Sequence, residues 1–422
     1  MKTRIAAIIA LSLLLPGTAL CQTTLDECIR LACKNYPQIK EYELIEASRN
    51  YDLNSIATAW IPQVSISGKA TWQSDVVEMP FDIQGMNFDI PHDQYGIVAD
   101  ITQQIWDGGA TAIRRKLSNA AADAKKSQLE VNLYAIRSRV QNIYLGIILL
   151  DKQLELNRLL KDNLSRSLDE LDALLQAGVA LATDKDQVQV SILGCEQQKT
   201  SLETDRKAYV RMLGLLTGSE MGDAGFEEPR VYAAALPGGD VRRPEIKLYE
   251  TQKAQVALQN RQLNTSFYPR VQFNVQAGYG RPGLNMLSGT FDPYIIAGLK
   301  FQWNLGPLYT LKNDRRKLEA ETERIDLARR SFLLNTSIEA TQKMSEVEKA
   351  ADIMARDEEI IRLRQHIREN AEHQYREGVI KMNDYLNLLD EEFKARQNGS
   401  IHSVQYTMAV LDLQNTLGND NQ

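Results

Sequence analysis

The sequence predicts a mainly α-helical protein in which very long, coiled-coil-like helices are joined to four β-strands of the transmembrane type. Three observations support this fold class. Proline is absent from 92–228 and from 308–422, which leaves two stretches long enough for exceptional helices. All four tryptophans lie in short segments beside strand-like alternation. The chain also repeats its own landmarks in one order, which indicates two copies of one structural plan.

The composition excludes several classes of protein. Among 422 residues, 49 Lys and Arg stand against 55 Asp and Glu, and the net charge of −6 argues against a nucleic-acid binder. Four cysteines are too few for a disulfide scaffold. A helical membrane protein is excluded because the one long apolar run lies at the N-terminus. No nucleic acid is therefore expected among the partners.

The first 21 residues have the pattern of a secretory signal peptide. Lys2 and Arg4 precede an apolar run over 5–15, which is too short to span a bilayer, and small residues fill the cleavage positions up to Cys21. The alternative is lipidation of Cys21. Leu20 counts against it, because a small residue is wanted directly before a lipidated cysteine.

Two copies of about 200 residues, 22–217 and 243–418, are predicted. Residues 218–242 form a linker rich in Gly, Glu, Pro and Ala, and 419–422 form a short tail. Five pairs of segments match in the same order, with offsets between 197 and 207: 36–40 with 243–247, 59–62 with 266–269, 105–109 with 302–306, 114–117 with 315–318, and 177–179 with 377–379.

Each copy begins with a helix and later carries two long ones. Apolar residues at three- and four-residue spacing predict helices over 110–176 and 183–216 in the first copy, and over 309–376 and 383–417 in the second. Helices of this length exceed the globular average and imply coiled-coil-like packing.

Each copy also carries two segments in which apolar and polar residues alternate, over 63–72 and 95–106, and over 270–279 and 294–304. The length suits a tilted transmembrane strand, and aromatic residues sit at the strand ends, as in an interfacial girdle. The alternative is a soluble β-sandwich with one face exposed to solvent. The interface aromatics are Trp60, Trp72, Trp106, Tyr268 and Trp303, and the charges expected to face a lumen are Lys69, Asp100, Arg270 and Lys300.

Four strands cannot close a barrel, and a bilayer does not tolerate an open sheet edge. A membrane location therefore requires the chain to oligomerise, with each protomer supplying part of the wall. The loops between paired strands, 73–94 and 280–293, are expected outside the cell. The long helices are expected on the periplasmic side.

These features together resemble the TolC family of outer membrane efflux channels. The more specific pieces are Pro62 and Pro269 before the first strand of each copy, the 106–109 end of the second strand, and glycine turns at Gly178 and Gly378. The resemblance implies a homotrimer with a shared 12-stranded β-barrel in outer membrane lipid and an α-helical barrel across the periplasm. It implies the exit duct of a tripartite efflux or type I secretion system, with a periplasmic adaptor and an inner-membrane transporter of RND or ABC type as partners.

The glycine turns are expected at the periplasmic tips, since glycine supplies the positive φ that a tight helix end needs. A purely structural interpretation of Asp184 and Asp384 is that they cap the N-termini of the next helices, with Thr183 or Asn383 beside them. The resemblance instead implies that Asp384 lines a closed entrance and that Tyr375 ties the tip shut, with Asp184 in the partner position. This chain departs from the family pattern at two positions, because Asn387 replaces a second aspartate and Ile380 replaces a basic residue next to Lys381.

No catalytic constellation is present in the sequence. Cys28 and Cys33 are five apart on a predicted helix, about 140° around its axis, which disfavours a bond between them, and with Cys195 they are expected to be small buried residues. His366 and His373 share a helix face but have no further ligand pattern beside them. We expect no metal, no cofactor and no enzymatic activity. A secreted periplasmic coiled-coil scaffold with a small β head is the rival to a channel.

Overall fold

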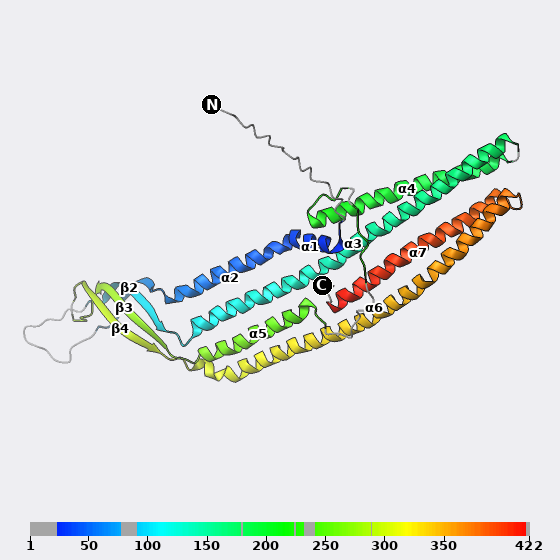
Figure 1. Ribbon diagram of the computed structural model, residues 1–422. Coiled ribbons are helices and arrows are strands. Elements are labelled where there is room, and N and C mark those ends of the chain that lie inside the picture. Colours follow the sequence, from blue (N-terminus) through cyan, green and yellow to red (C-terminus); the bar gives the residue numbers. More distant parts are fainter. Residues whose placement is uncertain are drawn as a thin grey trace, which may run out of the picture. The chain divides into compact units, whose positions relative to one another are not determined.

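The computed structural model describes residues 23–76, 91–178, 180–222, 225–231, 241–287 and 289–418. The predicted signal peptide, the question of Cys21 lipidation, the 419–422 tail and the middle of the 218–242 linker lie outside these residues. Over the described part the chain is mainly helical with four strands, which confirms the predicted fold class (Figure 1).

The bounds of the elements follow the repeated order of the sequence. The strands are β1 (Gln63–Trp72), β2 (Asp93–Trp106), β3 (Arg270–Arg281) and β4 (Asp292–Gln302). The helices are α1 (Leu25–Asn35), α2 (Glu41–Ala57), α3 (Ala110–Gln176), α4 (Ala182–Thr217), α5 (Pro244–Thr265), α6 (Leu311–Arg376) and α7 (Met382–Leu417).

Four elements differ from their predicted bounds by two residues. β2 begins at Asp93 rather than at 95, β3 ends at Arg281 rather than at 279, and β4 begins at Asp292 rather than at 294, because strand pairing continues to Asp93–Trp72, Tyr95–Arg281 and Gly280–Asp292. β4 ends at Gln302 rather than at 304, because its pairs with β3 run only from Gly280–Asp292 to Arg270–Gln302. α6 begins at Leu311 rather than at 309, because Gly306–Tyr309 form a 3₁₀ turn that starts with Gly-Pro.

The chain forms two compact units, and these do not coincide with the two sequence copies. The first contains 23–39, 132–242 and 336–418, and the second contains 40–131 and 243–335, within the described residues. Each unit therefore contains residues of both copies. The long helices α3 and α6 pass from one unit to the other.

The second unit contains one antiparallel sheet with strand order β1-β2-β3-β4. One cross-strand row joins Ile66, Ala99, Ala277 and Ile295, and the row two residues along joins Val64, Ile101, Val275 and Ala297. The intervening rows are mostly polar, so the register puts apolar side chains on one face and polar side chains on the other. A bulge between Gln104 and Trp106 shifts the register by one residue and places Trp106 opposite Val271 at the end of β2.

The helical part of the second unit is held by ion pairs and by a thin apolar seam. Lys253 pairs with Asp326 at 2.9 Å and Lys247 with Glu130 at 3.0 Å. Val256 of α5 and the facing Ile325 of α6 are each 7% exposed. The polar surfaces of these helices are otherwise open to solvent.

The first unit has a more apolar core. Tyr144 of α3 is fully buried, and its hydroxyl lies 2.6 Å from the backbone carbonyl oxygens of Thr23 and Glu227. Cys28 and Cys195 are buried, and burial raises the pKa of the Cys28 thiol to about 11. These two cysteines therefore act as small apolar core residues. Across the described residues, no helix is both long enough and apolar enough to cross a membrane.

Candidate functional site at the helix tips and along the sheet

Both helix hairpins of the first unit reverse at a glycine. Gly178 has φ +74° and Gly378 has φ +73°, and their amides donate to the carbonyl oxygens of Leu175 and Tyr375 at 3.0 and 2.9 Å. Neither glycine has another atom within 4 Å of an added Cβ. Backbone conformation, rather than crowding, therefore favours glycine at both turns.

The predicted N-cap positions are wrong by two or three residues. α4 starts at Ala182 with Leu181 as N-cap, and α7 starts at Met382 with Lys381 as N-cap. Asp184 and Asp384 are thus the third residues of their helices. Asp384 still satisfies a helix-end donor, because its Oδ2 accepts the Lys381 backbone N–H at 3.3 Å.

An apolar cluster joins the two hairpins beside the turns. It contains Leu164 and Leu171 of α3, Val188 and Cys195 of α4, Ala371 of α6, and Met382, Tyr385 and Leu389 of α7. Ile380 packs against this cluster. The resemblance implies a basic residue at this position, but in this chain Ile380 contributes to apolar packing.

Tyr375 lies at the centre of the tip contacts. Its ring stacks on that of Tyr385 with centroids 5.9 Å apart and an interplanar angle of 18°. Burial, and then the charges of Asp184 and Glu170, raise the pKa of the Tyr375 hydroxyl. Tyr375 is thus close enough to Asp184 to feel its charge.

Two ion pairs at the tips were not predicted. Arg376 Nη2 donates to Glu170 Oε1 at 3.0 Å and so joins α6 to α3. Lys185 Nζ lies 2.5 Å from Asp172 Oδ1 and joins α4 to α3. Asp172 and Lys185 lie six residues before and seven after Gly178, so opposite charges flanking one turn were a signal for that pair. The sequence carries no such signal for the Arg376–Glu170 pair, which joins two different hairpins.

Asn387 lies in a groove of about 620 Å³ that is lined by α3, α4 and α7. Asp186 and Asp390 line the same groove, so the carboxylates near Asn387 differ from the predicted gate residues Asp184 and Asp384. Asp384 is exposed beside this groove, and Lys381 is exposed with no ion pair among the described residues. The structure therefore groups Asp184, Tyr375, Lys381, Asp384 and Asn387 around the two turns of one unit.

The sheet places the four predicted lumen charges on one face. Lys69 lies opposite Gly96, Asp100 opposite Ser65 and Gln276, Arg270 opposite Gln302, and Lys300 opposite Gln272. The other face carries exposed apolar side chains. Ile66, Ile295 and Leu299 are 76%, 74% and 72% exposed.

The predicted interface aromatics flank the exposed apolar band. At the helix end of the sheet, Trp106 and Tyr268 lie with ring centroids 6.5 Å apart, and Trp303 Nε1 donates to the Phe267 carbonyl oxygen at 2.8 Å. Trp60 lies at the same end, directly before β1. At the loop end, Trp72 stacks on His92 at 6.3 Å.

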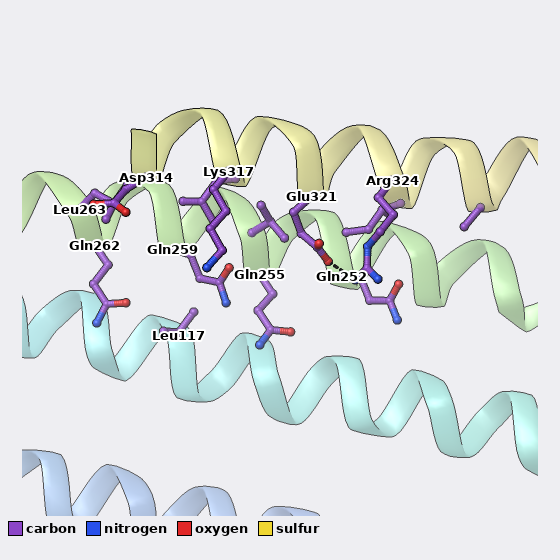
Figure 2. A pocket seen from close by; sticks show the side chains of 14 residues that line it. Leu117, Gln252, Gln255, Gln259, Gln262, Leu263, Asp314, Lys317, Glu321 and Arg324 are labelled. Carbon is purple, nitrogen blue, oxygen red and sulfur yellow. Dashed lines mark hydrogen bonds and ion pairs between the residues drawn. The ribbon is translucent and has the colours of Figure 1, made fainter. Parts of the chain in front are cut away.

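A groove of about 800 Å³ between α5 and α6 marks the polar side of the second unit (Figure 2). The two walls carry polar residues at identical spacing. They are Gln252, Gln255, Gln259 and Gln262 on α5, and Asp314, Lys317, Glu321 and Arg324 on α6.

This groove and the polar face of the sheet lie on the same side. A neighbouring groove shares Leu117 and Gln255 with it and is also lined by Gln63, which starts the polar row of β1. One continuous polar side therefore runs along the sheet and the helices of this unit.

The comparisons with known proteins agree with this geometry. A sequence model of the family described as "Outer membrane efflux protein" matches residues 28–219. Over those residues, which are just under half of the chain, the sequence is similar to the outer membrane efflux protein family. The match includes β1, β2, α3 and α4, so it covers strands and tip alike. The predicted resemblance and the predicted outer membrane location, with a helical periplasmic part, are both confirmed.

One curated relative is described as "Pyoverdine export outer membrane protein OpmQ" of Pseudomonas aeruginosa. It is 26% identical over 251 residues, which are 57% of this chain and 50% of that protein. The alignment thus spans about half of the relative's length.

Solved structures show the same fold over almost the whole chain. The outer-membrane channel OprN has a TM-score of 0.67 at 15% identity and covers 94% of this chain and 90% of its own. The Campylobacter jejuni CmeC outer membrane channel has a TM-score of 0.61 at 14% identity, covering 94% and 85%. These neighbours are channels rather than enzymes.

Proposed function

We propose that the protein is the outer membrane channel of a tripartite efflux or type I secretion system. The observation that carries this proposal is the sheet, which has an exposed apolar face, a charged opposite face and two unpaired edge strands among the described residues. Pairing β1 with β4 of the next copy would satisfy both edges. A homotrimer then closes a 12-stranded barrel with Lys69, Asp100, Arg270 and Lys300 in its lumen.

The two sequence copies, 22–217 and 243–418, are proposed to descend from one duplicated unit. The repeated order of a shorter helical segment, two paired strands and two long helices supports this division. Each copy contributes one strand hairpin to the sheet and one helix hairpin to the tip.

The helix tips are proposed to form the closed periplasmic entrance. In a trimer, Asp384 contributes one carboxylate per protomer, and Asn387 leaves a second ring uncharged. Tyr375, stacked on Tyr385 and close to Asp184, ties the hairpins together. The Arg376–Glu170 and Lys185–Asp172 pairs add links between helices.

Adaptor docking is proposed at the groove lined by α3, α4 and α7. Leu160, Val190 and Phe393 give it apolar contacts within a polar rim, which suits a helix laid into a groove. An inner-membrane transporter of RND or ABC type supplies the energy, and the duct itself works passively, without a cofactor or metal and without catalysis.

Planar-bilayer recording tests the function. The purified full chain should give stepwise cation conductance, and chemical cross-linking should give a trimer. A protein that produces no conductance steps and is released from membranes in soluble form by carbonate would instead be the periplasmic scaffold.

A further inference from the structure

Positive charge gathers where the helices of the second unit meet the sheet. The ten residues nearest the sheet in α2, α3, α5 and α6 contain nine Lys and Arg against three Asp and Glu, whereas the whole chain has 49 against 55. The cations are Arg49, Arg114, Arg115, Lys116, Arg261, Lys312, Arg315, Arg316 and Lys317, and the carboxylates are Asp52, Asp314 and Glu319.

These cations lie close to the aromatic end of the apolar band. α3 begins four residues after Trp106, so Lys116 is about 9 Å along the helix from its start. Lys312 is the second residue of α6, and Arg316 lies about 8 Å from the start of that helix. The headgroup layer is several ångströms thick, and charges at this depth are within about one Debye length of its phosphates.

Three of the cations point away from the polar side. At 100° per residue, Lys116 lies about 150° around α3 from the residues that line the grooves, Leu117, Ser118 and Ala121. By the same measure Lys312 lies about 180°, and Arg316 about 140°, from the groove-lining side of α6. That direction is opposite to the side shared by the grooves and the polar sheet face, so it is the side of the apolar face, which an outer membrane location puts against lipid.

The three side chains are available for a ligand. Lys116, Lys312 and Arg316 are exposed, and within the described residues none has an ion pair or a side-chain hydrogen bond. Asp314 turns into the groove, which leaves Glu319 as the carboxylate on the outer side of 311–320.

We propose that Lys116, Lys312 and Arg316 form a basic collar that binds the phosphate headgroups of anionic phospholipids in the periplasmic leaflet. The inference rests on the outer membrane location and not on duct activity. Juxtamembrane cations concentrate anionic lipid at a membrane surface by about fivefold per residue. The collar would fix the depth of the sheet in the bilayer from the periplasmic side, while the aromatic residues fix it within the interface.

Tryptophan quenching by brominated lipid tests the collar. Trp60, Trp106 and Trp303 lie at the collar end of the sheet, so they report the lipid bound there. The full chain is reconstituted in phosphatidylcholine vesicles with increasing brominated phosphatidylglycerol. The native chain should prefer phosphatidylglycerol, added salt should reduce that preference, and K116Q/K312Q/R316Q should reduce it by about tenfold or more.

The matched control is R158Q/K349Q/R356Q, which removes three exposed cations from helix segments far from the strands. It should keep the native preference, as should the charge-preserving K116R/K312R/R316K. The proposal is overturned if the native chain shows no preference, if salt leaves the preference intact, or if the control loses as much as the collar variant. The salt titration needs no variant, so a misfolded mutant cannot leave the question open.

Discussion

At the residue scale, Asp384 has two separable roles, helix capping and negative charge. Asp384→Asn keeps an oxygen acceptor for the Lys381 N–H and removes the charge, whereas Asp384→Ala removes both. We expect Asn to weaken block by multivalent cations by about tenfold, since three carboxylates leave the proposed entrance. Ala, alone or with Tyr375→Phe, should also raise single-channel conductance, because losing a cap costs about 1 kcal/mol.

Planar-bilayer recordings with a multivalent cation on the periplasmic side measure both effects. Glu348→Gln is the control, because it removes an exposed carboxylate of α6 that lies 30 residues before the turn. Conductance and block that remain native in Asp384→Ala would refute the entrance assignment.

The tyrosines predict a dependence on alkaline pH. Burial is the largest cause that raises the pKa of Tyr375 and of Tyr385 in the folded chain. The folded tip therefore holds these protons more tightly than the unfolded chain does, and this stabilisation is complete below the ordinary tyrosine pKa of about 10. It declines as pH rises above about 10, so conductance should increase there. Tyr375→Phe should reduce the increase, and a variant with a native alkaline response would exclude Tyr375 from it.

At the scale of elements, the turn glycine can be compared with a helical one. Gly378 has φ +73° and Gly194 lies inside α4, and an added Cβ meets nothing within 4 Å at either. Gly378→Ala should therefore destabilise the tip by about 1–2 kcal/mol. Gly194→Ala should stabilise α4 by about 0.5–1 kcal/mol. Hydrogen exchange of the tip and α4 amides measures both effects on stability. Equal shifts in the same direction would show that the positive φ of Gly378 does not determine the effect of the substitution.

A buried ion pair joins α6 to α7 above the tip. Arg368 Nε donates to Glu392 Oε2 at 2.9 Å, and the Glu392 side chain is only 8% exposed. Arg368→Met should cost about 2–3 kcal/mol, because Arg396 still pairs with the carboxylate left behind. Arg362→Met should change stability by less than about 0.5 kcal/mol, since its pair with Glu359 is exposed. Hydrogen exchange in α7 distinguishes the variants, and equal effects would contradict the burial argument.

Periodicity was sufficient to locate the long elements, but not the contacts between them. The bounds of α3 are those predicted, 110–176, because glycines precede and follow an uninterrupted helical pattern. The Arg376–Glu170 pair could not be deduced, since it depends on which faces of α6 and α3 meet. The helix starts after the turns were misplaced for a related reason. Extended residues at 181 and 381 take the cap position through their backbone, without a capping side chain such as Thr183.

At the scale of the whole molecule, the two faces of the sheet should respond oppositely to the same substitution. Ile66 and Ser67 are neighbours on β1, and their side chains point to the apolar and the polar face. A lysine on a lipid-facing strand costs about 2–4 kcal/mol near the bilayer midplane, whereas a lumen position stays in water. Because every copy carries the substitution, this free-energy cost applies three times in a trimer. Ile66→Lys should therefore abolish carbonate-resistant trimer, while Ser67→Lys should assemble normally and change only ion selectivity. Fractionation and cross-linking of both variants decide the matter, since equal tolerance of the two lysines would mean that the apolar face does not contact lipid.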